Sequence, residues 1–134
     1  MRLDRLLHGR RVELPVACER WNMLHPGDAP RVPYVTQCLK DAPGVLIAAS
    51  DYVKALPDAI DRWLPRPLTA LGTDGFGRSE SRASLRDFFE VDYRYVIVAT
   101  LAALARDGKI DASVVDQAIK SHNINPDKAN PAVS

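Results

Sequence analysis

The residues that could take part in chemistry are most concentrated in residues 68–89. This segment has the sequence LTALGTDGFGRSESRASLRDFF. Gly72, Gly75 and Gly77 stand within six residues of one another. Glycine permits a positive φ and a close approach of another chain or ligand, and we predict a positive φ at Gly75 and Gly77. The spacing does not fit G-x-G-x-x-G, and no G-K-[S/T] follows. We therefore interpret the turn as a sharp strand-to-helix connection rather than a nucleotide loop.

Basic side chains follow this turn at regular intervals. Arg78, Arg82 and Arg86 are four residues apart, so a helix would place them in one stripe. A solvated helix face is the simpler interpretation of that stripe. The alternative is a contact surface, formed together with Asp74, that receives a carboxylate from a partner chain, because arginine pairs bidentately with carboxylates.

The other residues with chemical potential do not form a recognisable site. The histidines are scattered over three segments without metal-ligand spacing, at His8, His25 and His122. The serines of the turn (Ser79, Ser81, Ser84) have no histidine nearby in sequence, so we predict capping roles, with Ser79 or Ser81 as N-cap of the next helix. No H-E-x-x-H or G-x-S-x-G motif occurs. We predict no catalytic, cofactor-binding or metal-binding residue.

Two strands and a helix between them are predicted to position the turn. Residues 45–49 (VLIAA) form a continuous apolar run, typical of a strand covered on both faces, and residues 68–71 form the next strand. Ser50 or Asp51 is predicted to cap a helix that reaches about residue 64, with a kink or restart at Pro57.

Further helices are predicted on both sides of these strands. Residues 18–24 and 83–89 fit short helices, and the ambiguous segment 34–39 favours a helix. Residues 93–106 begin like a strand but continue into an alanine-rich run without a turn signal, so we expect one helix between Asp92 as N-cap and Gly108. Asp111 is predicted to cap a last helix that ends near residue 122, before an irregular tail.

Length and composition are those of one globular domain with a sizeable core. The chain has 134 residues, of which 46% are hydrophobic and 26% charged. A net charge of +1 gives no reason to expect nucleic acid or an anionic membrane as a partner. Cys18 and Cys38 lie in different segments, so we expect free thiols in a reducing cytoplasm. No apolar run reaches the ~20 residues that a bilayer span needs.

Six segments resemble one known family, the homodimeric thiamine-diphosphate-dependent pyruvate dehydrogenases, in their C-terminal, transketolase-like domain. The segments follow one collinear order, and the stretch from the first to the last of them spans roughly nine-tenths of the chain. They are CERWNMLHP at 18–26, PRVPYVTQ at 30–37, SDYVKALPDAIDRWLP at 50–65, GTDGFGRSESR at 72–82, FFEVDYRYVIVATLAALARDGKID at 88–111 and NINPDKANP at 123–131.

The resemblance fails over residues 1–17, which carry four arginines in the first eleven positions. We therefore divide the chain into a divergent N-terminal segment, 1–17, and a partial transketolase-like C-terminal domain, 18–134. The family resemblance implies an α/β fold with a small, mostly parallel sheet flanked by helices, here lacking the first strands of the domain.

In this family the intact enzyme decarboxylates pyruvate oxidatively and passes the acetyl group to a lipoyl group. Thiamine diphosphate and magnesium are held by other domains, and none of their ligands maps onto a residue present here. The resemblance thus implies that this piece is inactive alone and serves assembly, contacting the remaining domains, a second subunit or the acyltransferase core. A stand-alone protein-binding module and a non-functional remnant are the alternatives, and the reading frame upstream of Met1 would discriminate between them.

Overall fold

The computed structural model describes residues 13–134, and the predictions made for His8 and the arginine-rich start lie outside the described residues. The described chain forms two compact units, and the single domain expected from its length stays a prediction. One unit contains the residues up to 43 together with 62–65, and the other contains 44–61 with 66–134.

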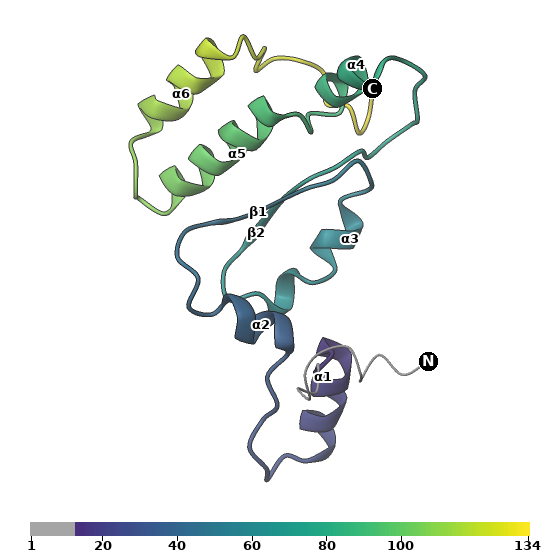
Figure 1. The fold of residues 1–134 in the computed structure, drawn as a ribbon, viewed down its shortest axis with the longest axis vertical. Helices are drawn as coiled ribbons and strands as arrows, with labels where there is room; N and C mark the ends of the chain where they lie inside the picture. The colour runs from purple at the N-terminus through teal and green to yellow at the C-terminus, as the bar shows by residue number, and fades with distance from the viewer. Residues whose placement is uncertain (1–12) are drawn as a thin grey trace. The chain divides into compact units, whose positions relative to one another are not determined.

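The second unit is built on a sheet of two parallel strands, β1 (Leu46–Ala49) and β2 (Leu68–Leu71). Leu46 pairs with Leu68 and Ala49 with Leu71, so both strands end at the same edge. Figure 1 shows α5 (Tyr93–Arg106) on one side of the strands and α3 (Ala55–Asp58) on the other. The predicted α/β fold with a small parallel sheet is confirmed.

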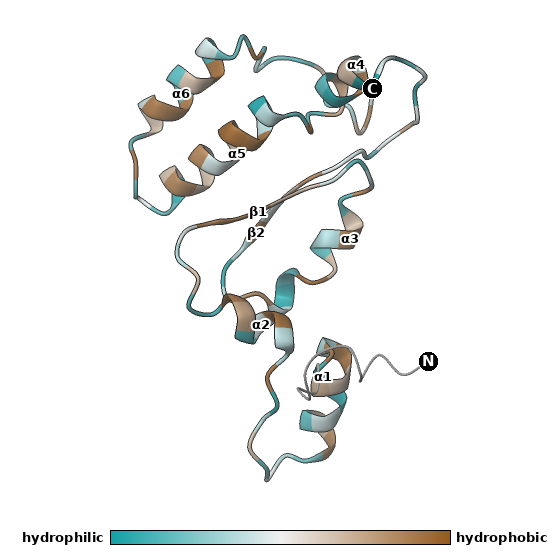
Figure 2. Ribbon diagram, viewed as in Figure 1, coloured by the Kyte–Doolittle hydropathy of each residue, from teal (hydrophilic) through white to brown (hydrophobic). Residues whose placement is uncertain are grey.

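Helices α5 and α6 (Ala112–Ser121) form a hairpin that packs through α5 on both strands. Figure 2 shows apolar residues concentrated along β1, β2 and α5. Asp92 caps α5 by accepting from the backbone N–H groups of Arg94 and Tyr95, and Asp111 caps α6 by accepting from Ser113. Gly108, at φ +67°, ends α5 in the left-handed conformation. The predictions for both helices are confirmed, with α6 ending one residue early.

The long helix predicted after Ser50 is wrong. The structure has only the single turn α3 and a 3₁₀ helix, Asp61–Trp63, in this segment. The carbonyl groups of Asp51 and Tyr52 accept hydrogen bonds from Thr73, at 2.9 Å each, so they are not available to a helix. Pro57 lies within the single turn of α3, where no preceding turn is present for its ring to disturb, and the chain leaves the helical conformation after Asp58, so no kink or restart occurs at Pro57.

Helix α4 (Arg82–Phe88) follows the glycine-rich turn. Its N-cap is Ser81, whose hydroxyl accepts from the N–H of Ser84 at 3.2 Å, so the alternative cap Ser79 is excluded. After the helix, Glu90 takes φ +61° and the N–H of Val91 donates to the carbonyl of Arg86, which is a Schellman ending. The ammonium of Lys128, from the irregular tail, donates to the carbonyls of Asp87 and Phe88 at 2.6 and 2.9 Å.

The first unit contains α1 (Pro15–Leu24) and α2 (Tyr34–Leu39). The prediction for α2 is confirmed, but α1 begins three residues before the predicted start at Cys18. Pro15 lies in the first turn of α1, where a backbone N–H has no acceptor within the helix, so the proline costs no hydrogen bond. The helix therefore begins at Pro15 and continues through Cys18 without a break.

Residues of the CERWNMLHP segment hold the first unit together. Glu19 accepts from the indole of Trp63 at 2.9 Å and pairs with Arg62. The amide of Asn22 bonds both backbone groups of Arg31, at 2.7 and 3.0 Å. Trp21 stacks on His25 with 4.3 Å between ring centroids. The side chains of this segment therefore form the hydrogen bonds, ion pair and ring contact that connect the parts of the first unit.

Little of the described chain is deeply buried. The buried hydrophobic residues are Cys18, Phe89 and Ala103, and β1 is only partly covered, not buried on both faces as predicted. The sheet has two strands, so within residues 13–134 each strand has one side without a neighbouring strand. No helix in residues 13–134 is long and apolar enough to cross a membrane.

Candidate functional site

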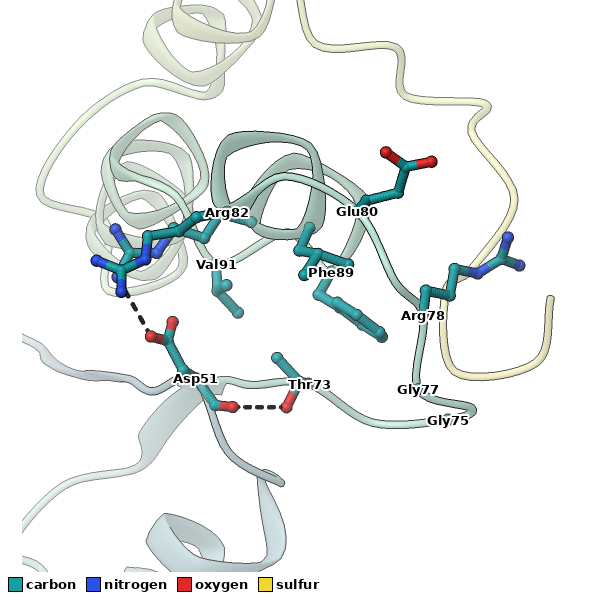
Figure 3. Close-up of a pocket in the computed structure, with 11 residues that line it drawn as sticks. Asp51, Thr73, Gly75, Gly77, Arg78, Glu80, Arg82, Phe89 and Val91 are labelled. Atoms are coloured by element: carbon teal, nitrogen blue, oxygen red, sulfur yellow. Dashed lines mark hydrogen bonds and ion pairs between the residues drawn. The ribbon is translucent and has the colours of Figure 1, made fainter.

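A cavity of about 440 Å³ lies in the second unit, between the glycine-rich turn and α4. It forms where the strands end: Asp51 follows β1, Thr73 follows β2, and both line the cavity with Gly75 and Gly77 (Figure 3). The carboxyl edge of a parallel sheet is a common place for a ligand site, because the loops that follow the strands meet there.

One face of α4 supplies the opposite wall. Arg82, Leu85, Arg86 and Phe89 all line the cavity, at the spacing i, i+3, i+4 and i+7 that places side chains on one helical face. The arginines were predicted to share a stripe on this helix. The sequence therefore contained the signal for this wall, although the cavity itself was not predicted.

The three arginines of the predicted contact surface do line one cavity, but from different elements. Arg78 lies in the turn before α4 and is not on the helix as the interval of four suggested. Its guanidinium stacks on the ring of Phe88, 4.2 Å from the centroid, and donates to the carbonyl of Ser134 at 3.3 Å. Arg78 thus serves to hold the C-terminal tail.

Arg86 and Arg82 differ in their partners. Arg86 forms an ion pair with Asp51 at 3.2 Å, and both side chains are largely exposed, so this pair adds little stability. Arg82 is exposed and makes no hydrogen bond, ion pair or ring contact with another residue of the described chain. A cation without a partner beside a cavity is available to bind an anion.

Asp74, the acidic member of the predicted contact surface, lies outside the cavity that the arginines line. Its carboxylate instead accepts from the backbone N–H of Lys54 at 3.0 Å and pairs with the Lys54 ammonium at 3.2 Å. The hydrogen bond from the Lys54 backbone is the main cause that lowers the pKa of Asp74. Asp74 therefore ties the glycine-rich turn to the loop before α3, and its part in a contact surface stays a prediction.

The glycines of the turn have different roles. Gly75 has φ +94°, as predicted, but Gly77 has no positive φ and open space where a Cβ would lie. At Gly72 a Cβ would stand 2.6 Å from the carbonyl oxygen of Tyr52 and 3.0 Å from the N of Lys54. The prediction for Gly77 is wrong, and the steric requirement at Gly72 comes from a loop that sequence reasoning could not place beside it.

The remaining chemical candidates have structural partners. His25 contacts Trp21, and His122 meets the ring of Tyr93 edge-on with 6.0 Å between centroids. Cys18 and Cys38 are free thiols, as predicted, and burial is the main cause that raises the pKa of Cys18. No group of three or more His, Cys, Asp or Glu that could hold a metal ion occurs in residues 13–134.

Comparison with known proteins agrees with the resemblance seen in the sequence. The family model of the transketolase-like TK C-terminal domain matches residues 7–92, which include every residue that lines the cavity. The chain belongs to this family. The match begins at residue 7, inside the segment predicted to be divergent, while the division at residue 17 stays a prediction.

The chain is also similar to the pyruvate dehydrogenase E1 components of several bacteria. It is 52% identical to that of Escherichia coli K12 over 118 residues, which are 87% of this chain and 13% of the relative. For the Pseudomonas aeruginosa protein the identity is 50% over 117 residues, with the same shares, and for the Mycolicibacterium smegmatis protein it is 46% over 109 residues. The chain thus spans about one-eighth of the length of the relatives that it matches.

Proposed function

We propose that the chain provides the C-terminal part of an E1 component of pyruvate dehydrogenase and serves its assembly. The intact homodimeric enzyme would act in the cytoplasm, decarboxylate pyruvate on thiamine diphosphate with magnesium, and transfer the acetyl group to a lipoyl group. Identity of about one-half to bacterial E1 components, over most of this chain, is the observation that carries the proposal.

Exposed apolar side chains support a role in contacts between domains or subunits. Large hydrophobic residues are more than half exposed on both units, among them Leu14, Val16, Met23, Leu24, Tyr52, Leu56, Phe76 and Tyr93. Single exposed apolar residues are ordinary, but such a number beside so small a core indicates surfaces that another polypeptide covers. The unpaired sides of β1 and β2 offer a further contact, because a strand edge can pair with another strand.

The partners in this proposal are the remaining E1 domains or a second subunit, and the acyltransferase core is a further candidate. The arginines of the predicted contact surface, Arg78, Arg82 and Arg86, would receive an anionic group. A stand-alone binding module is the second candidate function, and the cavity with the partnerless Arg82 is the observation that favours it.

Binding to an E1 component that lacks its own C-terminal part tests the assembly role. The E. coli K12 protein, shortened by the segment that matches this chain, would be immobilised, and the affinity of the purified 134-residue chain measured. We expect saturable binding that intact E. coli E1 does not show, because its own C-terminal part covers the contact. Equal binding to both forms, or to neither, would contradict the assembly role.

A further inference from the structure

The cavity beside α4 has the dimensions of a small-molecule site. Its volume of about 440 Å³ falls within the ~300–1,000 Å³ that such sites occupy, and it is lined by the sheet edge, the glycine-rich turn and α4. A contact between two proteins is formed by broader and flatter surfaces, so a concave site of this size favours a free ligand over a protruding loop.

The cavity combines an apolar wall with cationic groups. Leu85, Phe89 and Val91 provide the apolar wall, and Phe89 is only 8% exposed. Arg82 and Arg86 stand one helical turn apart on the same face. Glu80 also lines the cavity, and Figure 3 shows its carboxylate turned away from Asp51 and Thr73.

The donors present suit a carboxylate better than a phosphate or a nucleotide. The hydroxyl of Ser81 already accepts from the N–H of Ser84, so this N–H of the first turn of α4 is occupied. The glycine spacing does not form a phosphate-binding loop. Two neighbouring guanidinium groups can pair bidentately with a carboxylate, and the apolar wall beside them suits the body of an organic ligand, which an inorganic phosphate lacks.

We propose that this cavity binds a small organic carboxylate with an apolar body. Arg82 binds the carboxylate, Arg86 provides the second guanidinium by exchanging its exposed pair with Asp51, and the apolar body packs on Leu85, Phe89 and Val91. This binding goes beyond the assembly role and does not depend on it, since every residue involved belongs to one unit of this chain.

Ligand-observed saturation-transfer NMR on the full 134-residue chain tests the proposal with matched probes. Sodium hexanoate, 1-hexanol, hexylammonium chloride and inorganic phosphate separate the contributions of charge and apolar body. We expect hexanoate to bind at least about tenfold more tightly than the other three probes, and more weakly as salt is added. Equal affinity for 1-hexanol or for inorganic phosphate would overturn the proposal.

Variants locate the binding within the chain. Arg82→Gln removes the partnerless guanidinium without breaking a contact to another described residue, and we expect it to weaken hexanoate binding about tenfold. Arg82→Lys should weaken it less, because the charge remains while the bidentate geometry is lost. Arg20→Gln, at an exposed position of α1 that does not line the cavity, is the control with the same change of charge. Hexanoate affinity that falls equally in Arg20→Gln and Arg82→Gln, or in neither variant, would show that the cavity is not the site.

Discussion

Two glycines of the turn at residues 72–77 carry requirements that other side chains cannot meet. A side chain at Gly72 would collide with the backbone of Tyr52 and Lys54, and Gly75 has φ +94° with the backbone of Pro131 within 2.7 Å of a Cβ position. A positive φ disfavours any residue with a Cβ, and a collision with backbone cannot be relieved by a rotamer change. Gly77 meets neither restriction and provides an internal control.

We expect Gly72→Ala and Gly75→Ala each to lower the free energy of unfolding by ~1–3 kcal/mol, and Gly77→Ala to change it by less than ~1 kcal/mol. The third variant could even be stabilising, because alanine reduces the entropy of the unfolded chain. Urea unfolding of the three variants, followed by far-UV circular dichroism, gives the comparison. Similar midpoints for all three would show that the turn does not have this conformation.

Asp92 stabilises the start of α5 through both carboxylate oxygens. One oxygen accepts from the backbone N–H of Arg94, and the other accepts from the Arg94 side chain at 2.9 Å. Burial alone would raise the pKa of Asp92, but the hydrogen bonds from Arg94 outweigh it and lower the pKa below its usual value. Asp92 therefore contributes stability above the unfolded pKa of about 3.9, and this contribution is lost as the pH falls through the lower folded pKa.

The pH dependence of Asp92→Asn tests this coupling. Asparagine can still cap the helix but cannot form the ion pair, so we expect a loss of ~1 kcal/mol at pH 7. At pH 2 to 3 the difference from the unchanged chain should shrink, because the unchanged Asp92 becomes protonated there. Thermal melts of both proteins at the two pH values provide the measurement. An equal difference at both pH values would mean that Asp92 acts only as a cap.

At the level of elements, the N-terminus of α4 is capped by Ser81, one of the two serines that were candidates for this role. Ser81 accepts from the N–H of Ser84, and Ser79 is in the preceding turn. We expect Ser81→Ala to lower the free energy of unfolding by ~1 kcal/mol and Ser79→Ala to leave it nearly unchanged. Chemical denaturation of the pair separates the two positions. A larger loss for Ser79→Ala would place the start of α4 earlier.

Elements with purely local signals could be predicted from the sequence. Asp92 and Asp111 directly precede α5 and α6 and cap them, and Gly72 directly follows β2. Each of these boundaries is therefore determined by a residue next to it in the sequence. The segment after β1 could not be predicted in this way. Its apolar residues have helical spacing, but Thr73, some twenty residues later, binds the carbonyls that a helix would need.

In the candidate site, too, features with local sequence signals could be predicted, and features that depend on distant contacts could not. The arginine stripe and the inward positions of Leu85 and Phe89 follow from helical spacing along α4. The pairing of Asp74 with Lys54 could not be predicted because Lys54 lies in another loop. The position of Asp51 in the cavity likewise depends on the alignment of two strand ends. Contacts between segments distant in the sequence therefore account for the parts of the site that sequence reasoning missed.

For the whole molecule, the small core and the two-stranded sheet support the proposal that this chain works within a larger assembly. Three buried hydrophobic residues in the described chain and a sheet with an unpaired side on each strand give little cohesion, since isolated two-stranded sheets are marginal in water. The relatives that match this chain are about seven times as long, and their other domains are the proposed source of the missing contacts.

Restoration of activity tests the assembly role most directly. E. coli K12 E1 without the segment that matches this chain would be assayed for thiamine-diphosphate-dependent release of carbon dioxide from pyruvate, with and without the purified 134-residue chain. We expect the chain alone to be inactive, the shortened E1 to be impaired, and the mixture to recover activity saturably. An unchanged rate on addition of the chain, or carbon dioxide release by the chain alone, would contradict a role as the assembling C-terminal part of an E1 component.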